Sequence, residues 1–73
     1  MTPEELASRH PSVAEKLRYF EYEHLPVHLQ AVSKPCAELA YAMAKAMGDG
    51  PQLALGLQKL IEAKDCFVRN ALG

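Results

Sequence analysis

Two long helix-forming segments are separated by the turn Gly48-Asp49-Gly50-Pro51, which constrains the fold more than any other feature. Glycine favours the end of a helix and proline its first turn, so these residues predict that one helix ends and another begins here. Apolar residues recur at helical spacing before the turn, at Leu29, Val32, Cys36, Leu39, Met43 and Met47. We therefore expect an all-α fold with an antiparallel helical hairpin.

The helix after the turn is expected to run from about Pro51 to Ala71. Its broad buried face is predicted to contain Leu53, Leu57, Leu60, Ile61, Phe67 and Val68. Leu55 and Leu72 lie outside that face, and a chain of 73 residues buries too little apolar surface to be comfortably stable alone. These two facts predict packing between subunits of a homo-oligomer.

Pro35 interrupts the helical pattern that begins near Pro26. Inside a helix, proline removes one backbone hydrogen bond and clashes with the preceding turn. We expect a kink or a break around Ser33 and Lys34. Such a break would leave backbone groups near Lys34 free for a ligand.

Short helices are expected before the hairpin. Thr2 is placed to cap the first, and Pro11 is expected to end it. Ser12, followed by Glu15, is typical of a capping box and predicts a second helix that reaches about Tyr19.

The sequence predicts two parts, an N-terminal helical arm of residues 1–17 and a hairpin domain of residues 18–73. Val13, Leu17 and Phe20 recur at helical spacing, so Phe20 is interpreted as a packing residue. The arm is expected to pack on something larger.

Charge and composition narrow the functional classes. Eight Lys and Arg residues against nine Asp and Glu residues give a net charge of −1, which argues against binding to a nucleic-acid polymer. The acidic, polar N-terminus is unlike a signal peptide, and no apolar run reaches membrane-spanning length. Cys36 and Cys66 are interpreted as buried thiols on the two arms of the hairpin. We expect a complete, soluble, cytoplasmic protein.

His24 and His28 are four residues apart, a spacing that suits two metal ligands on one helical face. Pro26 lies between them, and no H-E-x-x-H motif is present. The favoured interpretation is that both histidines are exposed or cap a helix. A small metal-dependent enzyme that uses them is the weakest of the three functional hypotheses considered for this chain. No cofactor, no metal and no catalytic residue are predicted.

Cationic and aromatic residues offer two candidate ligand sites. Lys64 occupies a position where the helical pattern calls for an apolar residue, and Arg69 lies one turn on. The pair suits a phosphate group, although Lys64 snorkelling to the rim of an interface is an equal alternative. Tyr22 and Lys34 together would supply a face for base stacking and a cation for phosphate.

The run FEYEHLPVHLQAVSKPCAELAYAMAKAM, the Gly-Asp-Gly-Pro turn and the run LGLQKLIEAKDCFVRNAL together resemble phage anti-defence sponges. These are the anti-CBASS cyclic-nucleotide sponges and the related Thoeris anti-defence sponges, and the resemblance covers roughly residues 18 to 72. It implies an all-α homo-oligomer, typically a hexamer, with ligand pockets between protomers.

The resemblance also implies a ligand and residue roles. The expected ligand is a cyclic di- or trinucleotide, or a molecule of the cyclic ADP-ribose type, which is sequestered and not cleaved. Tyr22 matches the aromatic that stacks on a base, and Lys34 matches the lysine that contacts phosphates. Lys64 and Arg69 are assigned to a second pocket. The alternative hypothesis is a helical protein-interaction module without a small-molecule ligand.

Overall fold

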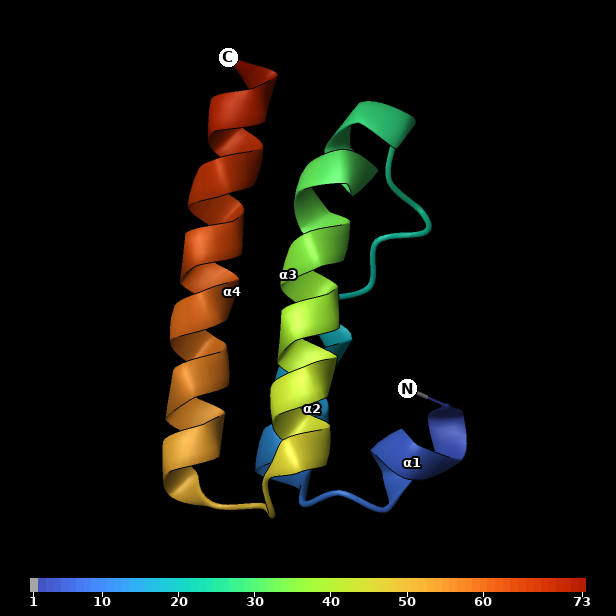
Figure 1. Cartoon of the computed structure of the whole chain (residues 1–73), viewed down its shortest axis with the longest axis vertical. Coiled ribbons are helices and arrows are strands. Elements are labelled where there is room, and N and C mark those ends of the chain that lie inside the picture. The colour runs from blue at the N-terminus through green and yellow to red at the C-terminus, as the bar shows by residue number, and fades with distance from the viewer. Residues whose placement is uncertain (1) are drawn as a thin grey trace.

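Four helices make up the computed structural model, which describes residues 2–73. They are α1 (Pro3–Ala7), α2 (Pro11–Arg18), α3 (Val27–Ala46) and α4 (Pro51–Leu72). No strand occurs in the described range, so the all-α prediction is confirmed. Figure 1 shows α3 and α4 lying side by side from the short connection that joins them, and α2 packs against both.

The core is centred on the apolar face of α2 and on Phe20, which lies two residues after the end of that helix. Val13, Leu17 and Phe20 are at most 1% exposed, because α3 and α4 cover them. Leu53, Leu57 and Ile61 contribute the face of α4. Lys16 strengthens the contact between α2 and α4, because its ammonium donates to Oε1 of Gln58 at 2.7 Å.

The buried face of α3 differs from the one that the spacing predicted. Ser33, Ala37, Ala40 and Ala44 face the core, together with Leu29 and Cys36. Leu39, Met43 and Met47 were expected there but are 48%, 38% and 47% exposed. Small residues suit this face of α3, since Phe20 and Leu17 already supply the bulk of the core that α3 shares with α2 and α4.

The prediction for α4 is right in its first half and wrong further along. Phe67 was expected to be buried but is 55% exposed, and Cys66 is exposed as well. α2 ends at Arg18, so its packing surface does not continue along the last turns of α4. Leu55 and Leu72 are exposed, as their positions outside the stripe predicted.

Pro35 does not break α3. The helix is continuous from Val27 to Ala46, so a break at Ser33 and Lys34, one of the two expected outcomes, does not occur. Proline removes a single backbone hydrogen bond, whereas Cys36 and Ala37 directly after it, and Ala40 further along, are buried in the core. Tertiary packing therefore outweighs the local penalty.

The helix caps are partly those expected. Oγ1 of Thr2 accepts a hydrogen bond from the backbone N–H of Glu5 at 3.1 Å, as an N-cap does. Ser12 is not the cap of α2, because that helix begins one residue earlier at Pro11. His10 takes the role, and its ring Nδ1 accepts from the N–H of Ser12 at 3.2 Å.

A charged clamp ties the segment between α1 and α2 to the end of α3. The Arg9 guanidinium donates to Asp49 at 2.6 Å, to the carbonyl of Ala44 at 2.6 Å and to that of Met47 at 3.0 Å. Asp49 also accepts from the backbone N–H of His10 at 2.8 Å. Arg9 thus caps the last carbonyls of α3, and Asp49 fixes the connection to α4.

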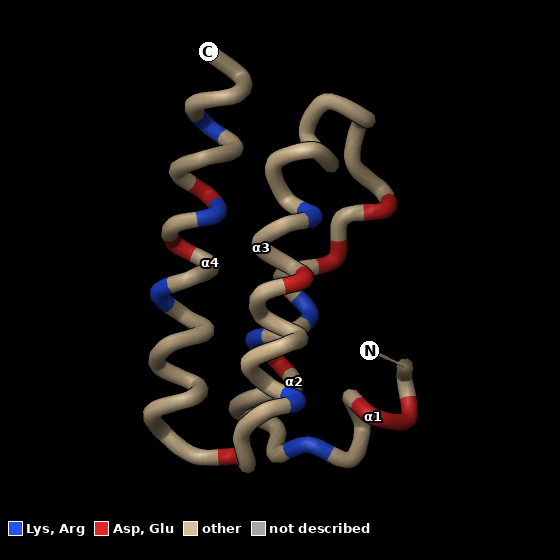
Figure 2. The backbone as a smooth tube through the Cα atoms, viewed as in Figure 1, with Lys and Arg blue, Asp and Glu red and all other residues tan. Residues whose placement is uncertain are grey.

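Positive and negative residues are interspersed over the molecule (Figure 2), and α4 has no charged residue before Lys59. Among the helices of residues 2–73, none combines the length and the hydropathy needed to cross a membrane.

We predict that Leu17→Ala destabilises the protein by about 2 to 5 kcal/mol, because it leaves a cavity at the centre of the core. Leu55→Ala is the matched control, since Leu55 is 47% exposed and should cost less than about 1 kcal/mol. Urea unfolding followed by circular dichroism measures both. Equal losses for the two variants would contradict the assigned core.

The clamp predicts a pH-dependent stability. Hydrogen bonds from the backbone of His10 and then from Arg9 hold the pKa of Asp49 below its ordinary value of 3.8. A lowered pKa stabilises the folded state above that value, and the stabilisation is lost as the pH falls through the folded pKa. Asp49→Asn should lower the thermal midpoint at pH 7, and its difference from wild type should shrink below about pH 4. Glu4→Gln is the control, and a difference that stays constant with pH would refute the prediction.

Candidate functional site

Two surface grooves meet at Arg18, the last residue of α2. We call the first the Tyr22 groove. Segments from α1, α2, the connection to α3, and α3 itself form it, and its lining residues are Thr2, Pro3, Leu6, Ala7, Leu17, Arg18, Glu21, Tyr22, Glu23 and Tyr41. Among these described residues, Arg18 is the one basic side chain.

Two tyrosines supply the aromatic surface of the Tyr22 groove. Tyr22 and Tyr41 are both partly buried and pack against the core. Burial raises the pKa of the Tyr41 hydroxyl, and the carboxylates of Glu23 and Glu21 raise it further. Tyr41 therefore keeps its proton at neutral pH and can donate a hydrogen bond to a ligand.

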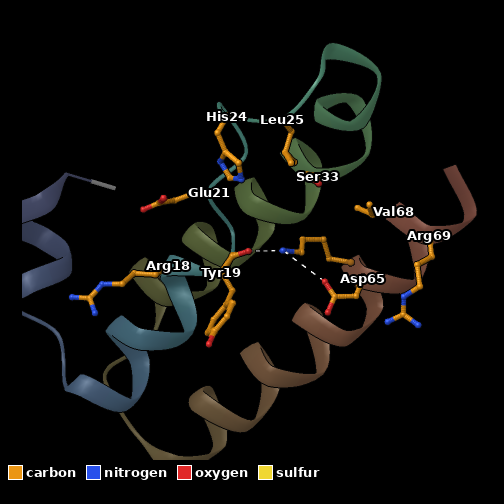
Figure 3. Close-up of a pocket in the computed structure, with 10 residues that line it drawn as sticks. Arg18, Tyr19, Glu21, His24, Leu25, Ser33, Asp65, Val68 and Arg69 are labelled. Carbon is orange, nitrogen blue, oxygen red and sulfur yellow. Dashed lines mark hydrogen bonds and ion pairs between the residues drawn. The ribbon is translucent and has the colours of Figure 1, made fainter. Parts of the chain in front are cut away.

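The second groove, which we call the Ser33 groove, lies between the end of α2, the connection to α3, and the facing sides of α3 and α4 (Figure 3). Its volume of about 510 Å³ is in the range of small-molecule sites. The lining residues are Arg18, Tyr19, Glu21, His24, Leu25, Ser33, Lys64, Asp65, Val68 and Arg69.

Lys64 reaches across the Ser33 groove from α4 to the end of α2. Its ammonium donates to the carbonyl of Tyr19 and lies 5.6 Å from the centroid of the Phe20 ring. Asp65 is its nearest carboxylate, at 3.9 Å, which is beyond hydrogen-bond distance. The side chain is only 14% exposed, so it is a largely buried cation with a weakly placed counter-charge.

Ser33 places a hydroxyl in the same groove. The residue is 1% exposed, and its Oγ has no hydrogen-bond partner within residues 2–73. A buried polar group without a partner costs about 1 to 3 kcal/mol. Native folds rarely leave such a group unpaired.

The structure brings together two of the four residues that the sequence singled out. Lys64 and Arg69 line the Ser33 groove, although Figure 3 shows the Arg69 guanidinium turned outward, away from Ser33. Tyr22 lies in the other groove. Lys34 is exposed on α3 and lines neither groove, so one chain does not combine Tyr22 and Lys34 in a single groove.

The histidines and cysteines are scattered over the described structure. His24 and His28 are both exposed, and residues 2–73 hold no group of three or more His, Cys, Asp or Glu side chains placed to bind a metal. Both thiols are free. Cys36 is buried, as expected, with its Sγ 3.6 Å from the carbonyl of Val32, whereas Cys66 is exposed, contrary to expectation.

The sequence pattern gave no role to Ser33, Arg18 or Tyr41. Ser33 lies two residues before Pro35, where a helix break was expected. The sequence pattern therefore gave no indication that Ser33 is buried. Arg18 stands four residues before Tyr22, a spacing that brings two side chains together within a helix. Because α2 ends at Arg18, this spacing could not predict that the two residues share a groove.

An apolar surface lies elsewhere on the molecule, where α3 and α4 approach their connection. It contains Leu39, Met43, Met47, Gln52, Leu53, Gly56, Leu57 and Leu60, with no charged residue among them. Gly56 faces open space within this surface.

No family model, no curated protein and no solved structure matches the chain.

Lys64→Met keeps the apolar stem of the side chain and removes its ammonium. We expect a loss of about 1 to 2 kcal/mol in unfolding free energy, because the charged hydrogen bond to Tyr19 disappears. Lys59→Met, at an exposed position on α4, is the control. Urea unfolding should separate the two variants, and identical curves would show that Lys64 does not tether α2.

Proposed function

We propose that this protein assembles as a homo-oligomer, a hexamer, and binds a cyclic oligonucleotide messenger without cleaving it. On this proposal it is a phage-encoded anti-defence sponge that acts in the cytoplasm of the host. Cyclic di- and trinucleotides, and molecules of the cyclic ADP-ribose type, are the ligand classes.

The observation that carries the proposal is the composition of the Tyr22 groove. Tyr22 and Tyr41 offer aromatic surface for a base, and Arg18 offers a guanidinium for a phosphate at the same groove. Base stacking on an aromatic side chain tolerates different bases, which suits a family of related messengers. The sequence resemblance independently assigns the stacking role to Tyr22.

Assembly supplies what one chain lacks. Glu21 and Glu23 line the Tyr22 groove beside Arg18, so a single chain offers a doubly charged ligand little net attraction. Lys34 is exposed and free to enter a pocket that a neighbouring copy completes. A site shared by symmetric copies needs few cations from each chain, and the apolar surface supports contact between copies.

Sequestration requires no chemical step. Removing free messenger lowers the occupancy of the host effector, so affinity and abundance set the outcome. A stacking face and charged hydrogen-bond donors are sufficient for such a function.

Calorimetric titration with cyclic dinucleotides, cyclic trinucleotides and cyclic ADP-ribose isomers tests the proposal. We expect saturable heat with at least one of them. Tyr22→Ala and Lys34→Ala should each weaken binding by about ten-fold or more, from lost stacking and a lost phosphate contact. Lys59→Ala is the control, because Lys59 is an exposed cation that lines neither groove.

Light scattering of each variant shows whether the assembly is intact. The proposal requires that both variants bind the ligand more weakly while their particle mass stays that of the wild type. Absence of heat with every ligand would overturn the proposal, and a change in mass would assign Tyr22 or Lys34 a structural role.

The apolar surface favours one second candidate, a helical protein-interaction module. Leu39, Met43 and Met47 are exposed at 38% to 48%, and flexible methionines adapt well to different partners. This candidate requires a monomer or simple dimer without a small ligand. A ligand-binding hexamer in solution would exclude it.

A further inference from the structure

We propose that the Tyr22 groove selects guanine over the other bases, with the carboxylate of Glu23 as the group that reads the base. The inference rests on the proposed function, because it names the base that a messenger bound in this groove carries. It gives a role to an acidic side chain that neither base stacking nor phosphate binding uses.

The acidic side chains of the groove are the first argument. Glu21 and Glu23 flank Tyr22, and both line the groove. Neither carboxylate takes part in an ion pair among residues 2–73, so both can accept hydrogen bonds from a ligand. Carboxylates repel phosphates, so the place for them in a nucleotide site is beside a base.

Guanine is the base whose edge suits a carboxylate. Its Watson–Crick edge carries two adjacent donors, N1–H and the N2 amine, next to the O6 acceptor. The two oxygens of one carboxylate accept from both donors at once. Adenine, cytosine and uracil each place a single donor beside at least one acceptor, so one carboxylate oxygen would face a lone pair of the base.

Tyr41 supplies a matching donor in the same groove. Its hydroxyl keeps its proton at neutral pH, because burial and then the carboxylates of Glu23 and Glu21 raise its pKa. Glu23 has the larger effect of the two carboxylates, and such effects fall with distance, so its charge lies near the Tyr41 hydroxyl. A hydroxyl donor beside a carboxylate acceptor complements the O6 acceptor beside the N1–H donor of guanine.

The backbone that carries Glu23 is held in place. The side-chain amide of Gln30 donates to the carbonyl of Glu23 at 3.3 Å and to that of Leu25 at 2.8 Å. These bonds tie the connection between α2 and α3 to the start of α3. Glu21, in contrast, also lines the Ser33 groove and lies where the two grooves meet. Glu23 is therefore the carboxylate assigned to the base.

Calorimetric titration with cyclic di-GMP, cyclic di-AMP and cyclic di-IMP tests the assignment without any variant. The wild type should bind cyclic di-GMP at least about ten-fold more tightly than cyclic di-AMP, because guanine donates both hydrogen bonds to the carboxylate. Cyclic di-IMP lacks only the N2 amine and keeps N1–H and O6. It should bind with intermediate affinity, because one of the two hydrogen bonds remains.

The variant Glu23→Gln should abolish the preference for guanine. Its amide has one acceptor and one donor group, so it pairs with adenine as well as with guanine. Glu21→Gln is the matched control, because it removes the same charge from the same groove. It should strengthen the binding of both ligands alike, through weaker repulsion of phosphate, and leave the ratio of their Kd values unchanged.

The outcomes separate this inference from the proposed function. Absence of heat with every cyclic nucleotide overturns the proposed function and this inference with it. Binding without a preference for guanine overturns this inference alone, as does a preference that survives Glu23→Gln. Equal affinities for cyclic di-GMP and cyclic di-IMP would show that the N2 amine meets no acceptor, which also contradicts the assigned contact.

Discussion

The burial of Phe20 and Leu17 in a core that α3 and α4 share is the constraint on which the rest of the structure depends. Both side chains are almost completely buried, and small residues of α3 suit a core whose bulk these two already supply. Phe20 lies two residues after the end of α2, so its burial holds that end against the core. Arg18, at that end, lines both candidate grooves, and Tyr19 lines the Ser33 groove.

Polar contacts then hold the two ends of α2 in place. At its start, Arg9 and Asp49 join the preceding segment to the connection between α3 and α4. At its end, Lys64 donates to Tyr19 and covers the Phe20 ring. A chain of this size has a small core, so a few charged hydrogen bonds are a substantial part of its stability.

The same arrangement places functional groups where the packing is incomplete. Lys64 has donors to spare, and Ser33 has a hydroxyl without a partner in residues 2–73, in the same groove. The Tyr22 groove, on the other side of Arg18, combines two aromatic rings with one guanidinium. The proposed ligand binding uses the aromatic and cationic groups of these grooves, and the proposed contact between copies uses the apolar surface near the α3–α4 connection.

The sequence by itself determined the helices, because glycine, proline and capping residues act locally. The turn at Gly48–Pro51, the Thr2 cap and the length of α4 all follow from residues within a few positions of each boundary. Lys64 and Arg69 also stood out, since helical spacing on one helix is a local property. Tertiary structure decided which face of α3 is buried, because the face that packs against α4 and α2 carries alanines and not the larger apolar residues. It also carried α3 through Pro35 and buried the Ser33 hydroxyl, since contacts between helices outweigh the loss of one backbone hydrogen bond.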